Sequence, residues 1–317
     1  MLLVRVDGIG DALACAPLVA ALRNAGHEVG ALLSTRNRHA FAERSFEHVH
    51  TVERIPWPRH GVTPASRQAA LDEVRALDYD VALIASEEVD AYAFARDAGI
   101  RQRTGFVNGW EKPFKTIAVR RRLTEAIWRP ASAARAREHE VETLFRLGAG
   151  LHGEMLPTRN LARLRPLVLD AEPPSHGRVI LQLDAKFVSS GIDIATFITV
   201  ARAIEAGGHK IRAVGADEDF NAAYAARSGL TSEHPATLGD WKALIAGASA
   251  VVTPDSGAAH VAGMIGVPAV VLFARGPSAE RDAARWRPWA APAKALVVTE
   301  PGEVAALVAD DLEAVLA

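Results

Sequence analysis

Short apolar runs that alternate with segments of helical pattern extend along almost the whole chain. The first run is Leu2–Val6, and a glycine turn then leads into a predicted helix over Ala12–Ala25. Continuous apolar runs are typical of strands buried on both faces of a parallel sheet. Parallel strands need crossover connections, and the intervening helices supply them. The alternation therefore predicts an α/β fold.

The first half of the chain repeats this pattern several times. Further strands are predicted at Glu28–Ser34, His48–Val52, Val81–Ser86 and Thr104–Phe106, and further helices at Arg38–Arg44, Ser66–Leu77 and Ala91–Ala98. Residues 107–130 interrupt the alternation, and the next helix is expected over Ala134–Leu147.

A segment rich in proline and arginine, Leu151–Gly177, is predicted to be a linker. A second series of strands (179–183, 210–214, 250–252, 269–273, 295–298) and helices (193–205, 219–228, 241–247, 258–265, 301–316) follows it. We therefore expect two doubly wound, Rossmann-like domains, residues 1–160 and 161–317, with a terminal helix that could pack back on the first domain. Ligands bind such sheets at the carboxyl ends of the strands, so we expect an interdomain cleft that holds a ligand.

The composition narrows the class of protein. The 317 residues are 49% hydrophobic and 23% charged, as in a soluble globular protein of two domains. The net charge of −2 gives no global field that would favour nucleic acid. The single cysteine, Cys15, excludes internal disulfides and a cysteine-based zinc site, and it fits a reducing cytosol. Without a membrane-spanning run or a signal peptide, we expect a cytoplasmic location.

One stretch of the second half, Val251–Phe273, is predicted to form a strand, a turn, a short helix and a further strand. A strand that enters a helix through Asp255-Ser256-Gly257 directs backbone N–H groups and the positive end of the helix dipole toward a ligand. The site predicted here binds phosphate through Asp255, Ser256, Gly257, Ala258 and, one turn into the helix, His260. Alternatively, Asp255 and Ser256 only cap the helix and His260 lies on the surface.

The first strand is followed by Gly8-Ile9-Gly10-Asp11. A dinucleotide-binding fingerprint would need a third glycine where Leu13 stands, so we do not expect NAD. The turn places Asp11 at the start of a helix. It can act there as an N-cap or as a general base, and the sequence alone leaves both open.

Three motifs together resemble glycosyltransferase family 9, the ADP-heptose:lipopolysaccharide heptosyltransferases and their relatives. They are the opening LVRVDGIGDALACAP, then REHEVETL from Arg137, and DSGAAHVAGMIGVP from Asp255 with RWRPW from Arg285. The resemblance implies a two-domain GT-B fold, an inverting sugar transfer, and no metal or other cofactor. It also implies a nucleotide-sugar donor on the C-terminal domain and a glycan acceptor on the N-terminal one.

Carried over position by position, the resemblance makes Asp11 the catalytic base. It assigns donor binding to Gly10, Lys186, Asp217, Asp255, Ser256, Gly257, Ala258 and His260. Lys186 stands where relatives have Lys-x-Trp, but Phe187 and Val188 replace the tryptophan context, so an ordinary loop lysine is the alternative. Asp217 is expected to contact ribose or to cap a helix, although Asp217-Glu218-Asp219 also spells a metal-binding Asp-x-Asp.

Basic residues gather between Lys112 and Arg137, together with Trp110, Phe114 and Trp128. The family resemblance implies that this segment, through Arg120, Arg121 and Arg122, meets a phosphorylated glycolipid or glycan at the cytoplasmic face of the inner membrane. The alternative is an ordinary solvated helix face.

Two other functions are compatible with the sequence. A nucleotide-sugar binding module without transferase activity is compatible with the altered surroundings of Lys186. A GT-B UDP-GlcNAc epimerase would show a preference for UDP and would need no acceptor.

Overall fold

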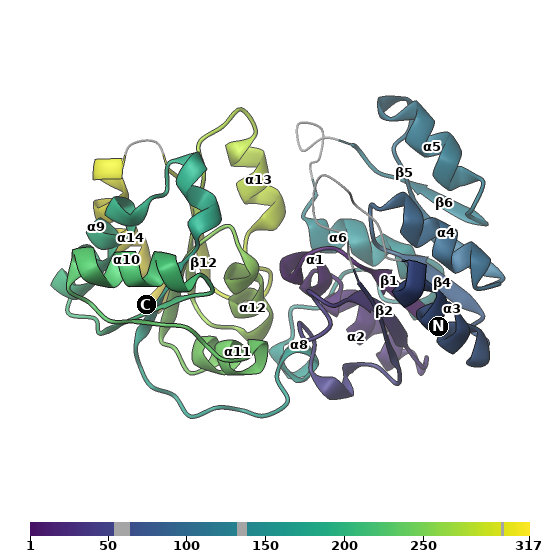
Figure 1. The fold of residues 1–317 in the computed structure, drawn as a ribbon, viewed down its shortest axis with the longest axis horizontal. Coiled ribbons are helices and arrows are strands. Elements are labelled where there is room, and N and C mark those ends of the chain that lie inside the picture. Colours follow the sequence, from purple (N-terminus) through teal and green to yellow (C-terminus); the bar gives the residue numbers. More distant parts are fainter. Residues whose placement is uncertain (54–63, 132–137, 299–300) are drawn as a thin grey trace. The chain divides into compact units, whose positions relative to one another are not determined.

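The computed structural model describes residues 1–53, 64–131, 138–298 and 301–317. The chain divides into two compact units, Met1–Arg159 and Asn160–Ala317. In the described residues each unit is built on a parallel six-stranded sheet with helices packed on it (Figure 1). The predicted α/β class and its two-fold repetition are confirmed.

The sheet of the first unit has the order β3-β2-β1-β4-β5-β6. Its strands are β1 (Leu2–Arg5), β2 (Gly30–Ser34), β3 (Val49–Val52), β4 (Val81–Ile84), β5 (Gln102–Val107) and β6 (Glu125–Trp128). The central strands are buried along their whole length, as their apolar sequences predict. The order reverses direction at β1, and in such sheets ligands bind beside the carboxyl ends of the strands at this point.

Helices of the first unit follow the strands in alternation. They are α1 (Ile9–Leu13), α2 (Ala16–Asn24), α3 (Pro64–Ala76), α4 (Val89–Asp97), α5 (Pro113–Arg120), α6 (Glu140–Phe145) and α7 (Ala149–His152). Leu2 and Val4 of β1 lie in one apolar cluster with Leu71 of α3 and Phe94 of α4. The single helix predicted over 12–25 is instead two, because Pro17 lies in the first turn of α2, where proline is tolerated.

The second unit repeats this architecture with the strand order β12-β11-β10-β7-β8-β9. Its strands are β7 (Val179–Leu183), β8 (Ile211–Gly215), β9 (Ser232–Glu233), β10 (Ala250–Pro254), β11 (Ala269–Phe273) and β12 (Ala293–Val297). Its helices are α8 (Leu161–Val168), α9 (Ile194–Ala206), α10 (Glu218–Ser228), α11 (Leu238–Ala246), α12 (Gly257–Ile265), α13 (Ala279–Trp286) and α14 (Pro301–Leu316).

The helices of the second unit cover both faces of its sheet. Leu181 of β7 lies in an apolar cluster with Phe197 of α9 and Val308 of α14, and these two helices pack on each other. The next residue, Gln182, points the other way and accepts a hydrogen bond from Trp241 Nε1 of α11 at 2.8 Å. Because side chains alternate along a strand, α9 and α14 cover one face and α11 the other.

Two further predictions about the first unit are wrong. Residues 38–44 do not form the predicted helix. The Asn37 side chain accepts from Ser34 N at 2.8 Å and donates to Arg5 O at 3.0 Å, so it holds this segment in a turn instead. Residues 107–130 do not interrupt the alternation, since they contain α5 and the edge strand β6, whose half-exposed sequence lacks a strong apolar run.

Three elements of the second unit were not predicted. Pro166 obscured α8 in the segment that we took for a linker, although Asn160 caps this helix and accepts from Ala162 N at 2.9 Å. The short strand β9 and the strongly charged α13 also lack the apolar runs on which the prediction depended. In the described parts of the chain, no helix is both long enough and apolar enough to span a membrane.

Candidate functional site

Asp11 lies just beyond the carboxyl end of β1, in the first turn of α1. Its Oδ2 accepts a hydrogen bond from Gly8 N at 2.9 Å. Gly8 is the N-cap and Asp11 the third helical residue, so the interpretation of Asp11 as an N-cap is wrong. A Cβ atom on Gly8 would lie 3.0 Å from Asp11 Oδ2, so a glycine at this position avoids a steric clash with the carboxylate. Gly10 occupies the same turn, and its carbonyl accepts from Ala14 N.

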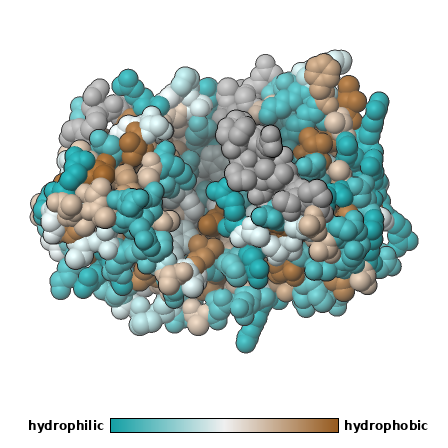
Figure 2. Space-filling view, viewed as in Figure 1, coloured by the Kyte–Doolittle hydropathy of each residue, from teal (hydrophilic) through white to brown (hydrophobic). Residues whose placement is uncertain are grey.

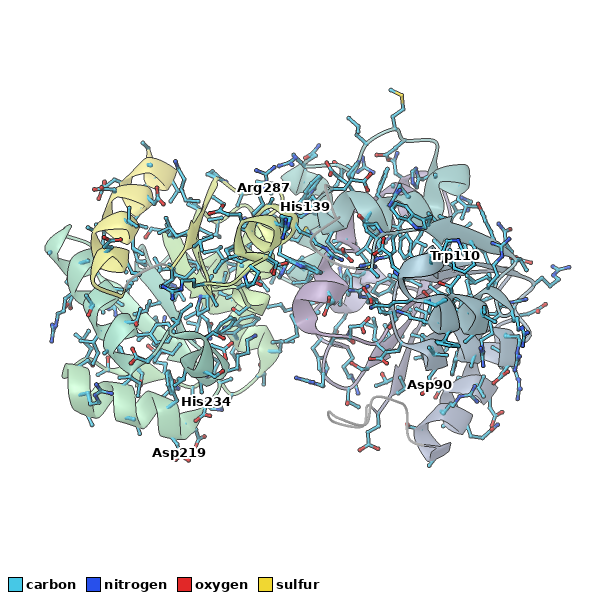
Figure 3. All side chains as sticks on the ribbon, turned by 90° about the horizontal axis from the view of Figure 1, so that it is seen from above. Asp90, Trp110, His139, Asp219, His234 and Arg287 are labelled. Atoms are coloured by element: carbon cyan, nitrogen blue, oxygen red, sulfur yellow. The ribbon has the colours of Figure 1, made fainter. Side chains whose placement is uncertain are left out.

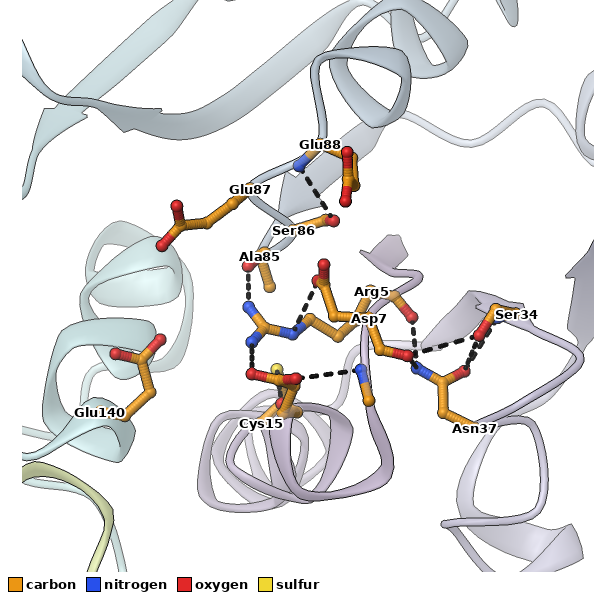
Figure 4. Close-up of polar contacts among 12 residues, drawn as sticks. Arg5, Asp7, Cys15, Ser34, Asn37, Ala85, Ser86, Glu87, Glu88 and Glu140 are labelled. Atoms are coloured by element: carbon orange, nitrogen blue, oxygen red, sulfur yellow. Dashed lines mark hydrogen bonds and ion pairs between the residues drawn. The ribbon is translucent and has the colours of Figure 1, made fainter. Parts of the chain in front are cut away.

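A buried arginine of β1, Arg5, orients the Asp11 carboxylate, and Figure 4 shows this arginine with its other partners Asp7 and Ala85. Arg5 Nη2 donates to Asp11 Oδ1 at 2.7 Å, Arg5 Nε lies 3.2 Å from Asp7 Oδ2, and Arg5 Nη1 donates to Ala85 O. Burial alone would lower the pKa of Arg5, but the carboxylates of Asp7 and Asp11 raise it above its ordinary value. The guanidinium, 3% exposed, therefore stays charged, while a third of the Asp11 side chain remains open to solvent.

A second buried arginine, Arg129, lies between two acids of the same unit. Arg129 Nη2 lies 2.8 Å from Glu87 Oε1, and Arg129 Nη1 lies 3.5 Å from Glu140 Oε1. Burial would raise the pKa of Glu87, but Arg129 and Lys115 lower it, so this carboxylate is ionised. Arg5 and Arg129 thus offset a group of acids gathered near the carboxyl ends of β1 and β4.

Cys15 lies beside this cluster as a neutral thiol. Burial raises its pKa to about 12, and its Sγ is 3.9 Å from Asp11 O. A thiol with so high a pKa is a poor nucleophile at neutral pH, so Cys15 takes no part in covalent chemistry here.

On the second unit, the predicted phosphate-binding turn has the expected form. β10 ends at Pro254, and Ser256 is the N-cap of α12. Ser256 Oγ accepts from Ala258 N at 3.3 Å and shares a hydrogen bond with Thr253 Oγ1 at 2.9 Å. The turn is thus fixed by a buried hydroxyl pair, and the first-turn N–H groups of Gly257 and Ala258 lie where a helix N-terminus attracts an anion.

His260 is buried in the first half of α12 rather than on the surface, so the expectation of a surface histidine is wrong. Its ring packs edge-on against Trp286 of α13, with 5.7 Å between the centroids. The backbone that follows α13 packs directly against Gly263, because a Cβ atom at this position would lie 2.7 Å from Trp289 N. The Arg285–Trp289 motif therefore supports the helix behind the turn.

Lys186 and Asp217 follow β7 and β8, the two strands that come after β10 in the order of the sheet. Lys186 lies in a 3-10 turn after β7, where its Nζ is 3.3 Å from Asp184 Oδ2 and 4.8 Å from the Phe187 ring centroid. More than half of its side chain is exposed. Asp217 caps α10 after β8, and its Oδ1 accepts from Phe220 N at 2.9 Å.

These segments come together because β10, β7 and β8 are parallel neighbours, so their carboxyl ends share one edge of the sheet. Ser256, Lys186 and Asp217 therefore lie along the same edge of the second unit. Among the described residues, no group of three or more His, Cys, Asp and Glu side chains is arranged to hold a metal ion, and Asp217-Glu218-Asp219 is no exception.

The predicted acceptor-binding arginines do not form one set. Arg120 and Arg121, at the end of α5, are exposed. Arg122 folds back and donates through Nη1 to Ala118 O, while its own carbonyl accepts from Arg103 Nε at 2.6 Å. Arg122 thus binds the C-terminal carbonyls of α5 and the neighbouring strand. Arg135 and Arg137 of the basic stretch lie outside the described residues.

The prediction missed Arg5, which holds Asp11, and Arg129 with its partners Glu87 and Glu140. The signal for Arg5 is present in the sequence, because it is the one charge inside the otherwise apolar run Leu2–Val6. A charge in a buried strand requires a partner, and that partner is found only in the folded chain.

The model of glycosyltransferase family 9 (heptosyltransferase) matches residues 67–313, well over half of the chain. The chain belongs to glycosyltransferase family 9. It is therefore a glycosyltransferase, and the interpretation as a binding module without activity is not supported. The match begins beyond Asp11, so the role of Asp11 depends on the geometry described above.

Solved structures share the fold of this family 9 enzyme at low sequence identity. The family 9 glycosyltransferase of Veillonella parvula is 15% identical with a TM-score of 0.73, covering 99% of this chain and 96% of that one. E. coli heptosyltransferase WaaC with ADP is 16% identical (TM-score 0.72, covering 99% and 97%). E. coli ADP-heptose lipopolysaccharide heptosyltransferase II is 18% identical (0.69, 99% and 98%).

WaaC is also known with ADP-2-deoxy-2-fluoro heptose, and this structure is 18% identical to the family 9 enzyme described here (TM-score 0.66, covering 99% and 97%). No curated protein sequence matches the chain. The structural similarity confirms the predicted GT-B architecture.

Proposed function

We propose that this family 9 enzyme transfers heptose from ADP-heptose to a phosphorylated glycan of the lipopolysaccharide core, with inversion and without a metal ion or another cofactor. The observation that carries the proposal is the shared sheet edge of the second unit, where the Ser256 turn, Lys186 and Asp217 lie together. The complexes of WaaC with ADP and with a fluorinated ADP-heptose support an ADP-linked donor.

The donor binds, in this proposal, with its diphosphate at the N-terminus of α12. First-turn N–H groups and the helix dipole there stabilise the charge that develops on the leaving nucleotide. Lys186 is exposed and lies on a short turn, so its Nζ can leave Asp184 for a phosphate. Asp217 follows the next strand, and its carboxylate suits a ribose hydroxyl.

Asp11 acts as the general base in the proposed reaction. An acceptor hydroxyl oxygen attacks the anomeric carbon, the bond from that carbon to the diphosphate breaks, and the hydroxyl proton passes to Asp11. Arg5 and the Gly8 amide fix the direction of the carboxylate before the acceptor arrives. Because attack and departure occur on opposite faces of the sugar, the configuration inverts.

Acceptor phosphates are expected to meet Arg120 and Arg121, whose side chains are exposed on the same unit as Asp11. Because the Arg122 guanidinium donates to the Ala118 carbonyl of α5, we propose only Arg120 and Arg121 for this role. An acceptor anchored in lipid would place the reaction at the cytoplasmic face of the inner membrane.

The proposal is tested by calorimetry and turnover with ADP-, UDP- and GDP-linked sugars, with and without a phosphorylated core oligosaccharide. We expect tight binding of the ADP-linked donor and release of ADP that depends on the acceptor. Turnover of a UDP sugar without any acceptor would instead indicate an epimerase. Binding of the donor with no turnover in the presence of a range of acceptors would overturn the proposal.

A further inference from the structure

Four large apolar side chains are exposed together on the first unit, around α5. Trp110 is 94% exposed and Phe114 88%, and Ile117 and Trp128 are each exposed over more than half of their surface. Figure 2 shows hydrophobic residues over the position of α5 at the upper right, and Figure 3 labels Trp110 in the view from above. Single exposed apolar residues are ordinary, but two aromatic rings this exposed and close together mark an interaction surface.

The local fold holds the segments that carry these side chains next to one another. Phe114 and Ile117 are three residues apart on α5, so they lie on one helix face. Thr116 Oγ1 donates to Gly109 O at 3.0 Å and ties the 3-10 turn Gly109–Glu111, which carries Trp110, to the helix. The Trp128 ring lies against Gly109, since a Cβ there would be 3.4 Å from Trp128 Nε1.

The opposite side of α5 anchors the helix in the unit. Val119 is fully buried in the apolar cluster of the first unit. Phe114 and Ile117 therefore lie on the exposed side of a helix that is already packed in its unit, so they are not part of an unfilled core.

Cations surround the exposed rings. Residues 109–122 contain five lysines and arginines and a single acid, Glu111, whereas the whole chain carries a net charge of −2. Lys112, Arg120 and Arg121 are exposed, while Glu111 Oε2 accepts from Ala131 N at 2.9 Å. We name this surface, formed by Trp110, Phe114, Ile117 and Trp128 with Lys112, Arg120 and Arg121, the aromatic wedge.

We propose that the aromatic wedge inserts into the headgroup region of a bilayer that contains anionic lipids. Tryptophan and phenylalanine bury their rings at the boundary between headgroups and acyl chains, and lysine and arginine pair with anionic headgroups around them. Four side chains are too few for a protein interface, which buries about 800 Å² on each partner, but they suffice for interfacial insertion. The purpose of this contact rests on the proposed function, because a lipid-anchored acceptor has to be reached at the membrane.

The test is binding to vesicles of phosphatidylethanolamine and phosphatidylglycerol, compared with pure phosphatidylcholine, for the full chain. We expect binding to the anionic vesicles that weakens as salt rises, since exposed charges are screened. Trp110→Ala with Phe114→Ala should reduce the affinity by about tenfold or more, because each ring loses the gain from burial in the bilayer. Arg120→Ser with Arg121→Ser should reduce it about fivefold per charge and flatten the salt dependence.

The matched control is Met155→Ala with Leu156→Ala, which removes two exposed apolar side chains of the same unit outside the wedge. The control should bind vesicles like the unchanged protein. Equal loss in the control, unchanged vesicle binding in the Trp110/Phe114 variant, or a dimer in light scattering that this variant abolishes would each overturn the proposal.

Calorimetry with ADP-heptose on the same samples separates this inference from the proposed function. Vesicle binding without donor binding would support the membrane role of the aromatic wedge and reject the donor assignment. Donor binding without vesicle binding would reject the membrane role alone. With a soluble core oligosaccharide, the Trp110/Phe114 variant should keep its turnover, and with acceptor embedded in vesicles it should lose most of it.

Discussion

At the scale of single residues, the chemistry that we propose for the first unit depends on the ion pair between Arg5 and Asp11. The guanidinium is almost fully buried and has Asp7, Asp11 and Ala85 O as partners. A buried charge needs such satisfaction, because desolvating it without partners costs several kcal/mol. Asp11 remains partly open to solvent, so one carboxylate both completes the buried cluster and stays accessible to a substrate.

The Asp11→Asn variant tests the role of this carboxylate. Loss of general-base catalysis should lower kcat by about 10²–10⁴-fold. Donor affinity should stay near that of the unchanged protein, because all predicted donor residues except Gly10 lie on the other unit. Asn keeps an acceptor for Gly8 N but loses the charge facing Arg5, which retains Asp7 and Ala85 O, so we expect a loss of about 1–3 kcal/mol in the free energy of unfolding. Kinetics, calorimetry and urea unfolding measure the three quantities.

The control for this variant is Asp90→Asn, which neutralises an exposed acid in the first turn of α4 on the same unit. It should leave kcat unchanged. A kcat of Asp11→Asn within a fewfold of the unchanged protein would refute the assignment of Asp11 as the base.

At the scale of elements, the Ser256 turn, which we propose binds the donor, depends on how closely the segment Pro288–Trp289 approaches α12. Gly263 lies inside α12, and its carbonyl oxygen also accepts a hydrogen bond from Ala290 N at 3.0 Å. The Pro288–Trp289 backbone takes the space that a side chain at position 263 would need. Small residues along α12 thus let the Arg285–Trp289 motif pack against the helix and cover His260.

The Gly263→Ala variant measures this packing. The added Cβ would lie 2.7 Å from Trp289 N and 2.9 Å from Pro288 Cα, and backbone atoms cannot move aside cheaply. Overpacking costs about 1–3 kcal/mol, whereas alanine gains about 1 kcal/mol over glycine in a helix. We expect the first effect to win, with a net loss of about 1 kcal/mol in urea unfolding and weaker donor binding in calorimetry.

Gly276→Ala is the matched control, since nothing lies within 4 Å of a Cβ there and its backbone needs no left-handed conformation. This control should be as stable as the unchanged protein. If Gly263→Ala is equally stable and binds the donor normally, the close approach has no energetic importance.

At the scale of the whole molecule, each unit has an apolar core of its own. Among the described residues, one buried apolar cluster of the first unit gathers residues between 2 and 119, and one of the second unit gathers residues between 179 and 315. All predicted donor-binding residues except Gly10 belong to the second unit, while Asp11, Arg120 and Arg121 belong to the first. The residues proposed for nucleotide binding, Gly10 apart, and those proposed for the acceptor therefore belong to different units.

Residues 160–317 expressed alone should consequently fold and bind ADP. We expect a cooperative unfolding transition in urea and an ADP affinity within about tenfold of that of the full chain. The fragment should transfer no sugar, because it lacks Asp11. Residues 1–159 serve as the control and should show no binding of ADP, and an unfolded second fragment would contradict the independence of its core.

The sequence by itself determined the fold class and the family. Buried parallel strands require continuous apolar runs, and Val179–Leu183 and Ala269–Phe273 therefore appeared at their observed places. The Ser256 cap was also predictable, because capping is a contact between residues two or three positions apart. The order of the opening, Asp255 and Arg285 motifs indicated glycosyltransferase family 9, which the family match confirms.

Only the tertiary structure decided what surrounds these local features. Arg5 reaches the carbonyl of Ala85, 80 residues away, and Arg129 joins Glu87 to Glu140. The sequence could not reveal these partners, nor that α5 turns its aromatic side outward, since both depend on which strands become neighbours. Periodicity reports only on residues within a few turns, whereas ion pairing and burial are set by segments that meet when the sheet assembles.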